Sequence, residues 1–212
     1  MYRKVKAVIF DLDGVLVDAA DWHYESLNLA LGHFGLAIPF EDHKVRFDGL
    51  PTRVKLKMLS ESKGLPVSLH DFINALKQRY TMEMFHTKCQ PYFPHEYLLA
   101  SLKKHDLRIS VASNSIRQTV DVALKRSALD KYVDFFLSNE DVGKAKPDPE
   151  IYLASFERHG LRPDECIIVE DNEKGIKAAR AAGGHVLVVD SVEDVNYLNV
   201  FNLIEKIETT AL

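Results

Sequence analysis

Short apolar runs alternate with amphipathic stretches along most of the chain, and this alternation constrains the fold more than any other feature. Apolar runs that separate polar segments at this spacing are typical of buried parallel strands joined by helices. The sequence therefore predicts an α/β fold, a doubly wound parallel sheet with helices on both faces. The expected strands are Val5–Phe10, Leu107–Ser113, Val133–Leu137, Cys166–Glu170 and His185–Val189, and the expected helices between the last four are Ile116–Arg126, Pro149–His159 and Glu173–Ala182.

The segment between the first and second expected strands breaks the alternation. It contains no convincing strand, and a direct crossover between parallel strands needs far fewer residues. We therefore expect residues 15–92 to form an inserted helical domain, and residues 1–14 and 93–212 to form the sheet domain. The helices expected in the insertion are Asp21–Phe34, Thr52–Lys63 and Leu69–Phe85.

Composition excludes several classes of protein. The 212 residues carry 27 Lys and Arg against 31 Asp and Glu, so the chain lacks the positive excess that nucleic-acid binding needs. Cys89 and Cys166 are in no metal-binding or disulfide spacing. The sequence shows neither a secretory leader nor an apolar stretch of membrane-spanning length. We expect a cytoplasmic protein with no nucleic-acid, membrane or obligate protein partner.

Pairs of acidic residues follow two of the expected strands. Asp11 and Asp13 come after the first strand, with Gly14 behind them, and Glu170 and Asp171 end the fourth. Because ligands of open α/β sheets bind beyond the carboxyl ends of the strands, we expect these carboxylates to share one rim. A polar turn is the alternative for the first pair. Helix capping is the alternative for the second, and it explains only one of the two acids.

Carboxylates this close together require a compensating charge. Two unit charges 4 Å apart repel by about 4 kcal/mol at an effective dielectric constant near 20. A hard divalent cation with oxygen ligands offsets such repulsion, and Mg²⁺ commonly takes carboxylates together with phosphate oxygens and water. The sequence therefore predicts a Mg²⁺ site at this rim.

An anion site is expected beside the acidic rim. Ser113 ends the second strand and Asn114 follows it, where hydroxyl and backbone N–H groups can bind phosphate. Lys146 lies in a loop directly before Pro147. The alternatives are a plain helix N-cap for the serine segment and a solvated surface lysine for Lys146.

Taken together, these motifs resemble the haloacid dehalogenase-like hydrolase superfamily over essentially the whole chain. The matching segments, in chain order, are FDLDGVLVD, VASNS, GKAKPDPEIY and IIVEDNEKG. The resemblance implies a Rossmann-like core with a helical cap. It also implies a Mg²⁺-dependent phosphatase that works through an aspartyl-phosphate intermediate.

The resemblance assigns a role to each of these residues. Asp11 is the implied nucleophile, and Asp13 the acid that protonates the leaving alcohol and then activates water. The implied metal ligands are Asp11, Asp13 through its backbone carbonyl, Asp171 and, as an additional ligand, Glu170. The implied phosphate-binding groups are Ser113, the Asn114 amide and Lys146.

Three residues of the insertion are candidates for substrate recognition. Gly49 and Arg53 lie in FDGLPTRVKL, which resembles the cap loop of phosphatases in this group. Arg53 is expected to reach a second anionic group, and a solvated arginine at a helix start is the alternative. His23 matches a histidine that orients the acid/base aspartate in the β-phosphoglucomutase-like group.

The substrate expected from the resemblance is a small phosphorylated metabolite, such as a sugar phosphate or a phosphoglycolate-like ester. Asp13 favours ester hydrolysis, because dehalogenating and phosphonate-cleaving relatives have no acid at this position. A hexose-phosphate mutase is the alternative, although Asn114 and the GLPTR segment depart from the mutase pattern. A non-catalytic binding protein is the third possibility, and the complete set of acidic and basic residues argues against it.

Overall fold

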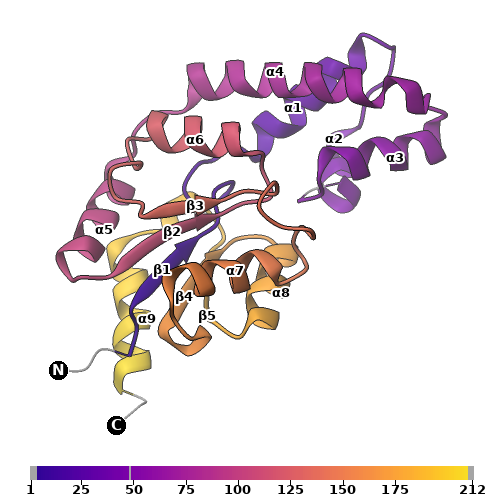
Figure 1. Ribbon diagram of the computed structural model, residues 1–212. Helices are drawn as coiled ribbons and strands as arrows, with labels where there is room; N and C mark the ends of the chain where they lie inside the picture. The colour runs from indigo at the N-terminus through magenta and orange to yellow at the C-terminus, as the bar shows by residue number, and fades with distance from the viewer. Residues whose placement is uncertain (1–3, 48, 210–212) are drawn as a thin grey trace. The chain divides into compact units, whose positions relative to one another are not determined.

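A sheet of five parallel strands forms the centre of the larger part of the chain, in the order β3-β2-β1-β4-β5 (Figure 1). The computed structural model describes residues 4–47 and 49–209. Every residue of the central strands β1 and β4 is buried, as expected of strands covered on both faces. The strands are β1 (Ala7–Phe10), β2 (Arg108–Ala112), β3 (Phe135–Leu137), β4 (Cys166–Glu170) and β5 (His185–Val188).

Helices cover this sheet on both faces, which confirms the predicted doubly wound α/β fold. On one face, Ile9 of β1 packs with Tyr152 and Phe156 of α7 and with Ala178 of α8. The sequence did not predict α5 or α9, which pack against each other. The helices are α5 (Phe93–Lys104), α6 (Arg117–Arg126), α7 (Glu150–His159), α8 (Glu173–Ala182) and α9 (Tyr197–Thr209), with short 3₁₀ turns η3 (Pro163–Glu165) and η4 (Val192–Asp194).

Strand register sets which side chains meet beyond the sheet. Phe10, the last residue of β1, stands opposite Val111 of β2 and Val169 of β4. The next residue, Asp11, donates its backbone N–H to the Val169 carbonyl oxygen at 3.0 Å. Asp11 is therefore level with Glu170, the last residue of β4.

The chain divides into two compact units, one formed by Met1–Asp18 with Gln90–Leu212 and the other by Ala19–Cys89. The described residues of the second unit are helical or irregular, with no strand among them. Its core is built from apolar side chains of helices α1, α3 and α4 together with Ile38, Phe47 and Leu65. Its helices are α1 (Ala20–Gly32), α2 (Phe40–Asp42), the π-helical turn η1 (His43–Phe47), α3 (Thr52–Lys63), the 3₁₀ turn η2 (Val67–Leu69) and α4 (His70–Lys88).

The helices of the described residues lack the length and apolar character of membrane spans. Among residues 4–47 and 49–209, none is long and apolar enough to cross a bilayer.

Candidate active site

The turn after β1 needs a glycine at its fourth position. Gly14 has φ +87°, in the left-handed region that L side chains rarely adopt, and its N–H donates to the Val17 carbonyl at 2.7 Å. A Cβ atom at this position would lie 2.1 Å from Asp171 Oδ2. The turn that carries Asp11 and Asp13 thus lies directly against Asp171.

Asp11, Glu170 and Asp171 form a compact acidic cluster. Each offers a carboxylate oxygen, and the three oxygens lie within 4.8 Å of one another. Burial raises the pKa of Asp11 well above its usual value, although the Lys146 ammonium group opposes the shift. Burial and the neighbouring Glu170 charge raise the pKa of Asp171 to about 6. Burial is the main cause of both shifts, and the neighbouring carboxylates add to it.

The donor set of this cluster fits a hard divalent cation. It consists of carboxylate oxygens only, which are the ligands that Mg²⁺ prefers. The Lys146 ammonium group forms ion pairs with Asp11 and Glu170, and its single positive charge does not balance three ionised carboxylates. Asp13 is the fourth predicted acid, and its Oδ2 accepts a hydrogen bond at 2.8 Å from the hydroxyl group of Ser115.

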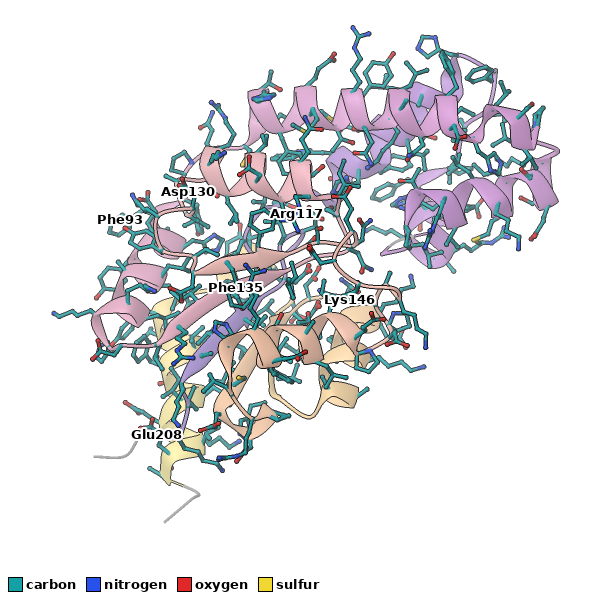
Figure 2. The ribbon with its side chains drawn as sticks, viewed as in Figure 1. Phe93, Arg117, Asp130, Phe135, Lys146 and Glu208 are labelled. Atoms are coloured by element: carbon teal, nitrogen blue, oxygen red, sulfur yellow. The ribbon has the colours of Figure 1, made fainter. Side chains whose placement is uncertain are left out.

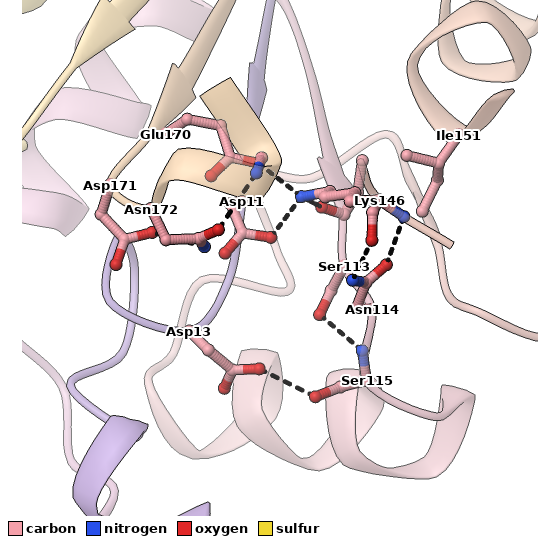
Figure 3. A network of polar contacts seen from close by, with 12 residues as sticks. Asp11, Asp13, Ser113, Asn114, Ser115, Lys146, Ile151, Glu170, Asp171 and Asn172 are labelled. Atoms are coloured by element: carbon pink, nitrogen blue, oxygen red, sulfur yellow. Dashed lines mark hydrogen bonds and ion pairs between the residues drawn. The ribbon is translucent and has the colours of Figure 1, made fainter. Parts of the chain in front are cut away.

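Lys146 lies inside the cluster and is only 4 % exposed, so it is not a solvated loop lysine. Its Nζ donates to Asp11 Oδ1 at 2.6 Å, to Glu170 Oε1 at 2.7 Å and to the Ala112 carbonyl oxygen at 2.8 Å. Ala112 is the last residue of β2, so the ammonium group sits at the carboxyl ends of the strands (Figures 2 and 3). Burial lowers the pKa of Lys146, but the two carboxylates outweigh this effect and the net pKa is raised.

The segment after β2 does not form a simple helix cap. Ser113 Oγ accepts from the Ser115 backbone N–H at 3.0 Å, whereas α6 begins two residues later, after Ile116. The Asn114 side chain pairs with the backbone of Lys146: Oδ1 accepts from its N–H at 3.0 Å, and Nδ2 donates to its carbonyl at 3.4 Å (Figure 3). Asn139 holds the Asn114 carbonyl oxygen at 2.8 Å. This pairing fixes the backbone of the loop that carries Lys146, and no sequence pattern predicted it.

Neither acid at the end of β4 caps the following helix. The N-cap of α8 is Asn172, whose Oδ1 accepts from the Gly175 N–H at 3.0 Å. The capping alternative for Glu170 and Asp171 is therefore wrong. A Cβ atom on Gly175 would lie 2.1 Å from the Glu170 carboxyl group, so α8 can approach that carboxylate because this residue is glycine.

Tyr152 contacts this acidic cluster and was not predicted from the sequence. It is fully buried on α7, and its hydroxyl group donates to Glu170 Oε1. Its ring lies under the Lys146 ammonium group, 4.8 Å from Nζ to the ring centroid. Burial and then the charge of Glu170 raise the pKa of Tyr152 well above its usual value, so the phenol stays protonated.

The three candidates from the insertion belong to the helical unit. His23 lies on α1, and its Nδ1 is 3.1 Å from Nζ of Lys77 on α4. Arg53 is exposed in the first turn of α3. The alternative, a solvated arginine at a helix start, describes the same position. Gly49 has φ +65° and directly follows Asp48, which lies outside the described residues.

A doubly wound sheet with an acidic cluster and a buried lysine at its strand ends is typical of α/β enzymes, whose ligands bind beyond the carboxyl ends of the strands. Comparison with protein families identifies the class more closely. The model of the haloacid dehalogenase-like hydrolases matches residues 8–189. The chain belongs to this family, which confirms the resemblance and the expectation of a hydrolase.

The similar proteins of the family include a phosphatase and β-phosphoglucomutases. A phosphorylated carbohydrates phosphatase of Thermotoga maritima is 31 % identical over 182 residues, which cover 84 % of this chain and 82 % of that protein. The β-phosphoglucomutase of Bacillus subtilis is 31 % identical over 195 residues, which cover 84 % of this chain and 80 % of that protein. The crystal structure of a β-phosphoglucomutase from Clostridium difficile superposes with a TM-score of 0.81 at 23 % identity, covering 95 % of this chain and 98 % of that one. This last likeness establishes the shared fold.

Proposed function

We propose that this protein is a Mg²⁺-dependent phosphatase that hydrolyses a small phosphomonoester, such as a sugar phosphate or a phosphoglycolate-like ester. The observation that carries the proposal is the buried contact of Asp11 with Lys146 inside the acidic cluster. In the proposed reaction Asp11 is the nucleophile and Lys146 the phosphate-binding cation, and this contact holds their side chains together. The name of the Thermotoga maritima relative, a phosphatase of phosphorylated carbohydrates, supports the same class of substrate.

Asp11 is the nucleophile of the proposed reaction. Its carboxylate attacks phosphorus, the bond to the ester oxygen breaks, and an aspartyl-phosphate forms. Water then attacks the same phosphorus atom, releasing phosphate and restoring Asp11. The pKa of Asp11 is raised by burial even with Lys146 in contact at 2.6 Å, so a further positive charge at the site would favour the ionised carboxylate.

The metal ligands in this proposal are Asp11, Asp171, the backbone carbonyl of Asp13, and Glu170. When bound, Mg²⁺ would shield the carboxylates from the incoming anion and stabilise charge on the transferred phosphoryl group. Asp13 protonates the leaving alcohol and later deprotonates the water, and the hydroxyl group of Ser115 holds its carboxylate in place at 2.8 Å.

The phosphoryl oxygens are bound by the Ser113 hydroxyl group, the Asn114 backbone N–H and the Lys146 ammonium group. Such preorganised donors contribute about 3–4 kcal/mol each to transition-state binding. We assign substrate selection to the helical unit, with Arg53, Gly49 and His23 as the residues involved.

Phosphate release from a panel of phosphomonoesters, measured with Mg²⁺, tests the proposal. Turnover should appear with sugar phosphates or phosphoglycolate and disappear in the Asp11→Asn variant. Undiminished turnover in that folded variant contradicts the covalent mechanism. No release from any ester by the wild-type chain supports the third possibility, a binding protein that retains the fold.

A mutase is the second candidate, favoured by the 31 % identity to the Bacillus subtilis β-phosphoglucomutase. Incubation with β-glucose 1-phosphate separates the two activities. Free phosphate as the product supports the phosphatase, and glucose 6-phosphate supports the mutase.

A further inference from the structure

The two oxygens of the Glu170 carboxylate have different surroundings. Oε1 accepts from Lys146 Nζ at 2.7 Å and from the hydroxyl group of Tyr152. Oε2 is buried and accepts no hydrogen bond from any residue that the structure describes. A buried carboxylate oxygen without a donor is costly, and a cation is the partner that such an oxygen can take.

The backbone of α8 limits how this carboxylate can lie but does not decide which oxygen faces Lys146. The carboxyl group packs against Gly175, where an added Cβ atom would be 2.1 Å from both oxygens and from Cδ. The terminal torsion of a glutamate is broad and roughly two-fold. The donors on Oε1 must therefore set the orientation of the carboxylate.

Tyr152 is suited to this task. Its side chain is fully buried, so the hydroxyl group needs an acceptor within the protein, and Glu170 provides it. Its ring lies 4.8 Å from the Lys146 ammonium group, a cation–π contact that supports the second donor to the same oxygen. One side chain thus contacts both members of the Lys146–Glu170 ion pair.

We propose that Tyr152 is a positioning residue of the metal site, whose hydroxyl group holds Glu170 Oε1 beside Lys146 and so presents Oε2 to the divalent cation. This inference rests on the proposed Mg²⁺-dependent function. Without the hydroxyl group, Lys146 is the remaining donor, and the carboxylate can turn toward it. Partners that orient a metal ligand typically account for about 10- to 100-fold in metal affinity.

Calorimetric titration of the full chain with MgCl₂ tests the inference without relying on activity. Tyr152→Phe keeps the ring and removes the hydroxyl group. We expect it to bind Mg²⁺ about tenfold more weakly than the wild type. Tyr97→Phe is the matched control, because Tyr97 is 51 % exposed on α5 and takes no part in the cluster. The control should keep the wild-type affinity.

Activity provides a second readout. The turnover of Tyr152→Phe should recover its wild-type maximum when the Mg²⁺ concentration is raised about tenfold, in line with the loss of affinity. A merely structural role would instead lower the melting temperature and the turnover number at every Mg²⁺ concentration. Equal Mg²⁺ affinities of wild type and Tyr152→Phe overturn the inference. A wild-type chain that binds no Mg²⁺ overturns the proposed function itself.

A comparison within the Glu170→Gln background covers the case in which Tyr152→Phe alone does not fold. Glutamine keeps an acceptor for the Tyr152 hydroxyl group but carries no charge, so loss of that hydroxyl group leaves no buried charge unpaired. In the Glu170→Gln background, the Tyr152→Phe change should leave Mg²⁺ affinity unaltered, because the carboxylate it positions is gone. A further loss of affinity in that background shows that Tyr152 acts by another route and overturns the inference.

Discussion

Gly175→Ala should destabilise the protein, although the same change in most helices is favourable. Within a helix, alanine is preferred over glycine by about 0.5–1 kcal/mol. At this position the added Cβ atom would lie 2.1 Å from the Glu170 carboxyl group, which is fully buried and cannot move into solvent. The substitution must therefore displace Glu170 from its two donors, Lys146 and Tyr152.

The expected cost follows from those contacts. Hydrogen bonds to a charged group contribute about 1.5–3 kcal/mol each, and overpacking of a tight interior costs about 1–3 kcal/mol. If one hydrogen bond is lost and the helix preference is recovered, the free energy of unfolding falls by about 2–5 kcal/mol. Because Glu170 is displaced, Mg²⁺ affinity should fall as well.

Urea unfolding followed by circular dichroism measures the first effect, and calorimetric titration with Mg²⁺ measures the second. Gly32→Ala is the matched control, since Gly32 ends α1 and an added Cβ atom there meets nothing within 4 Å. The control should be neutral or slightly stabilising. If Gly175→Ala raises stability as much as Gly32→Ala and leaves Mg²⁺ affinity unchanged, the close packing of α8 on Glu170 is refuted.

Three further predictions concern the loop that carries Lys146, the metal and a buried histidine. Asn114→Ala should lower the turnover number at least tenfold, with a smaller change in KM, because the backbone of Lys146 loses its side-chain partner. Steady-state kinetics measure both constants, and an unchanged turnover number would contradict this role. EDTA should abolish phosphate release and added Mg²⁺ should restore it, and full turnover in chelator would contradict the acidic-cluster argument. Burial lowers the pKa of His159 to about 4, so the folded state binds fewer protons than the unfolded state below pH 6.5. Stability should therefore fall by on the order of 2 kcal/mol from pH 7 to pH 4, a value reduced for solvent screening. Urea midpoints should show a smaller fall in His159→Gln, which keeps a partner for the Ser110 hydroxyl group, and equal falls would rule out His159 as the cause.

The sequence was most informative where local pattern and topology coincide. The apolar runs of β1 and β4 end directly at acidic residues, and adjacent parallel strands bring such ends together. This is why the proximity of Asp11 to Glu170 and Asp171 could be predicted. Helix α5 was not predicted, although Pro94 lies in its first turn, where proline is tolerated.

Contacts made by side chains across elements were not predictable. Tyr152 has the spacing of an ordinary core residue on α7, and only the packing of that helix on β4 places its hydroxyl group against Glu170. The pairing of Asn114 with Lys146 joins residues 32 positions apart through backbone atoms, which leave no pattern in the sequence. The same holds for Lys77, which meets His23 because α4 packs along α1.

Detection of a phosphoryl group on Asp11 tests the central claim most directly. The Asp13→Asn variant lacks the base for phosphoryl release, while p-nitrophenyl phosphate has a leaving group that needs no acid. Mixed with this ester and Mg²⁺, the variant should release a burst of one p-nitrophenolate per chain. Mass spectrometry of the quenched protein should then place the phosphoryl group on Asp11. No burst from an ester that the wild type hydrolyses, or a phosphoryl group on another residue, would contradict the account.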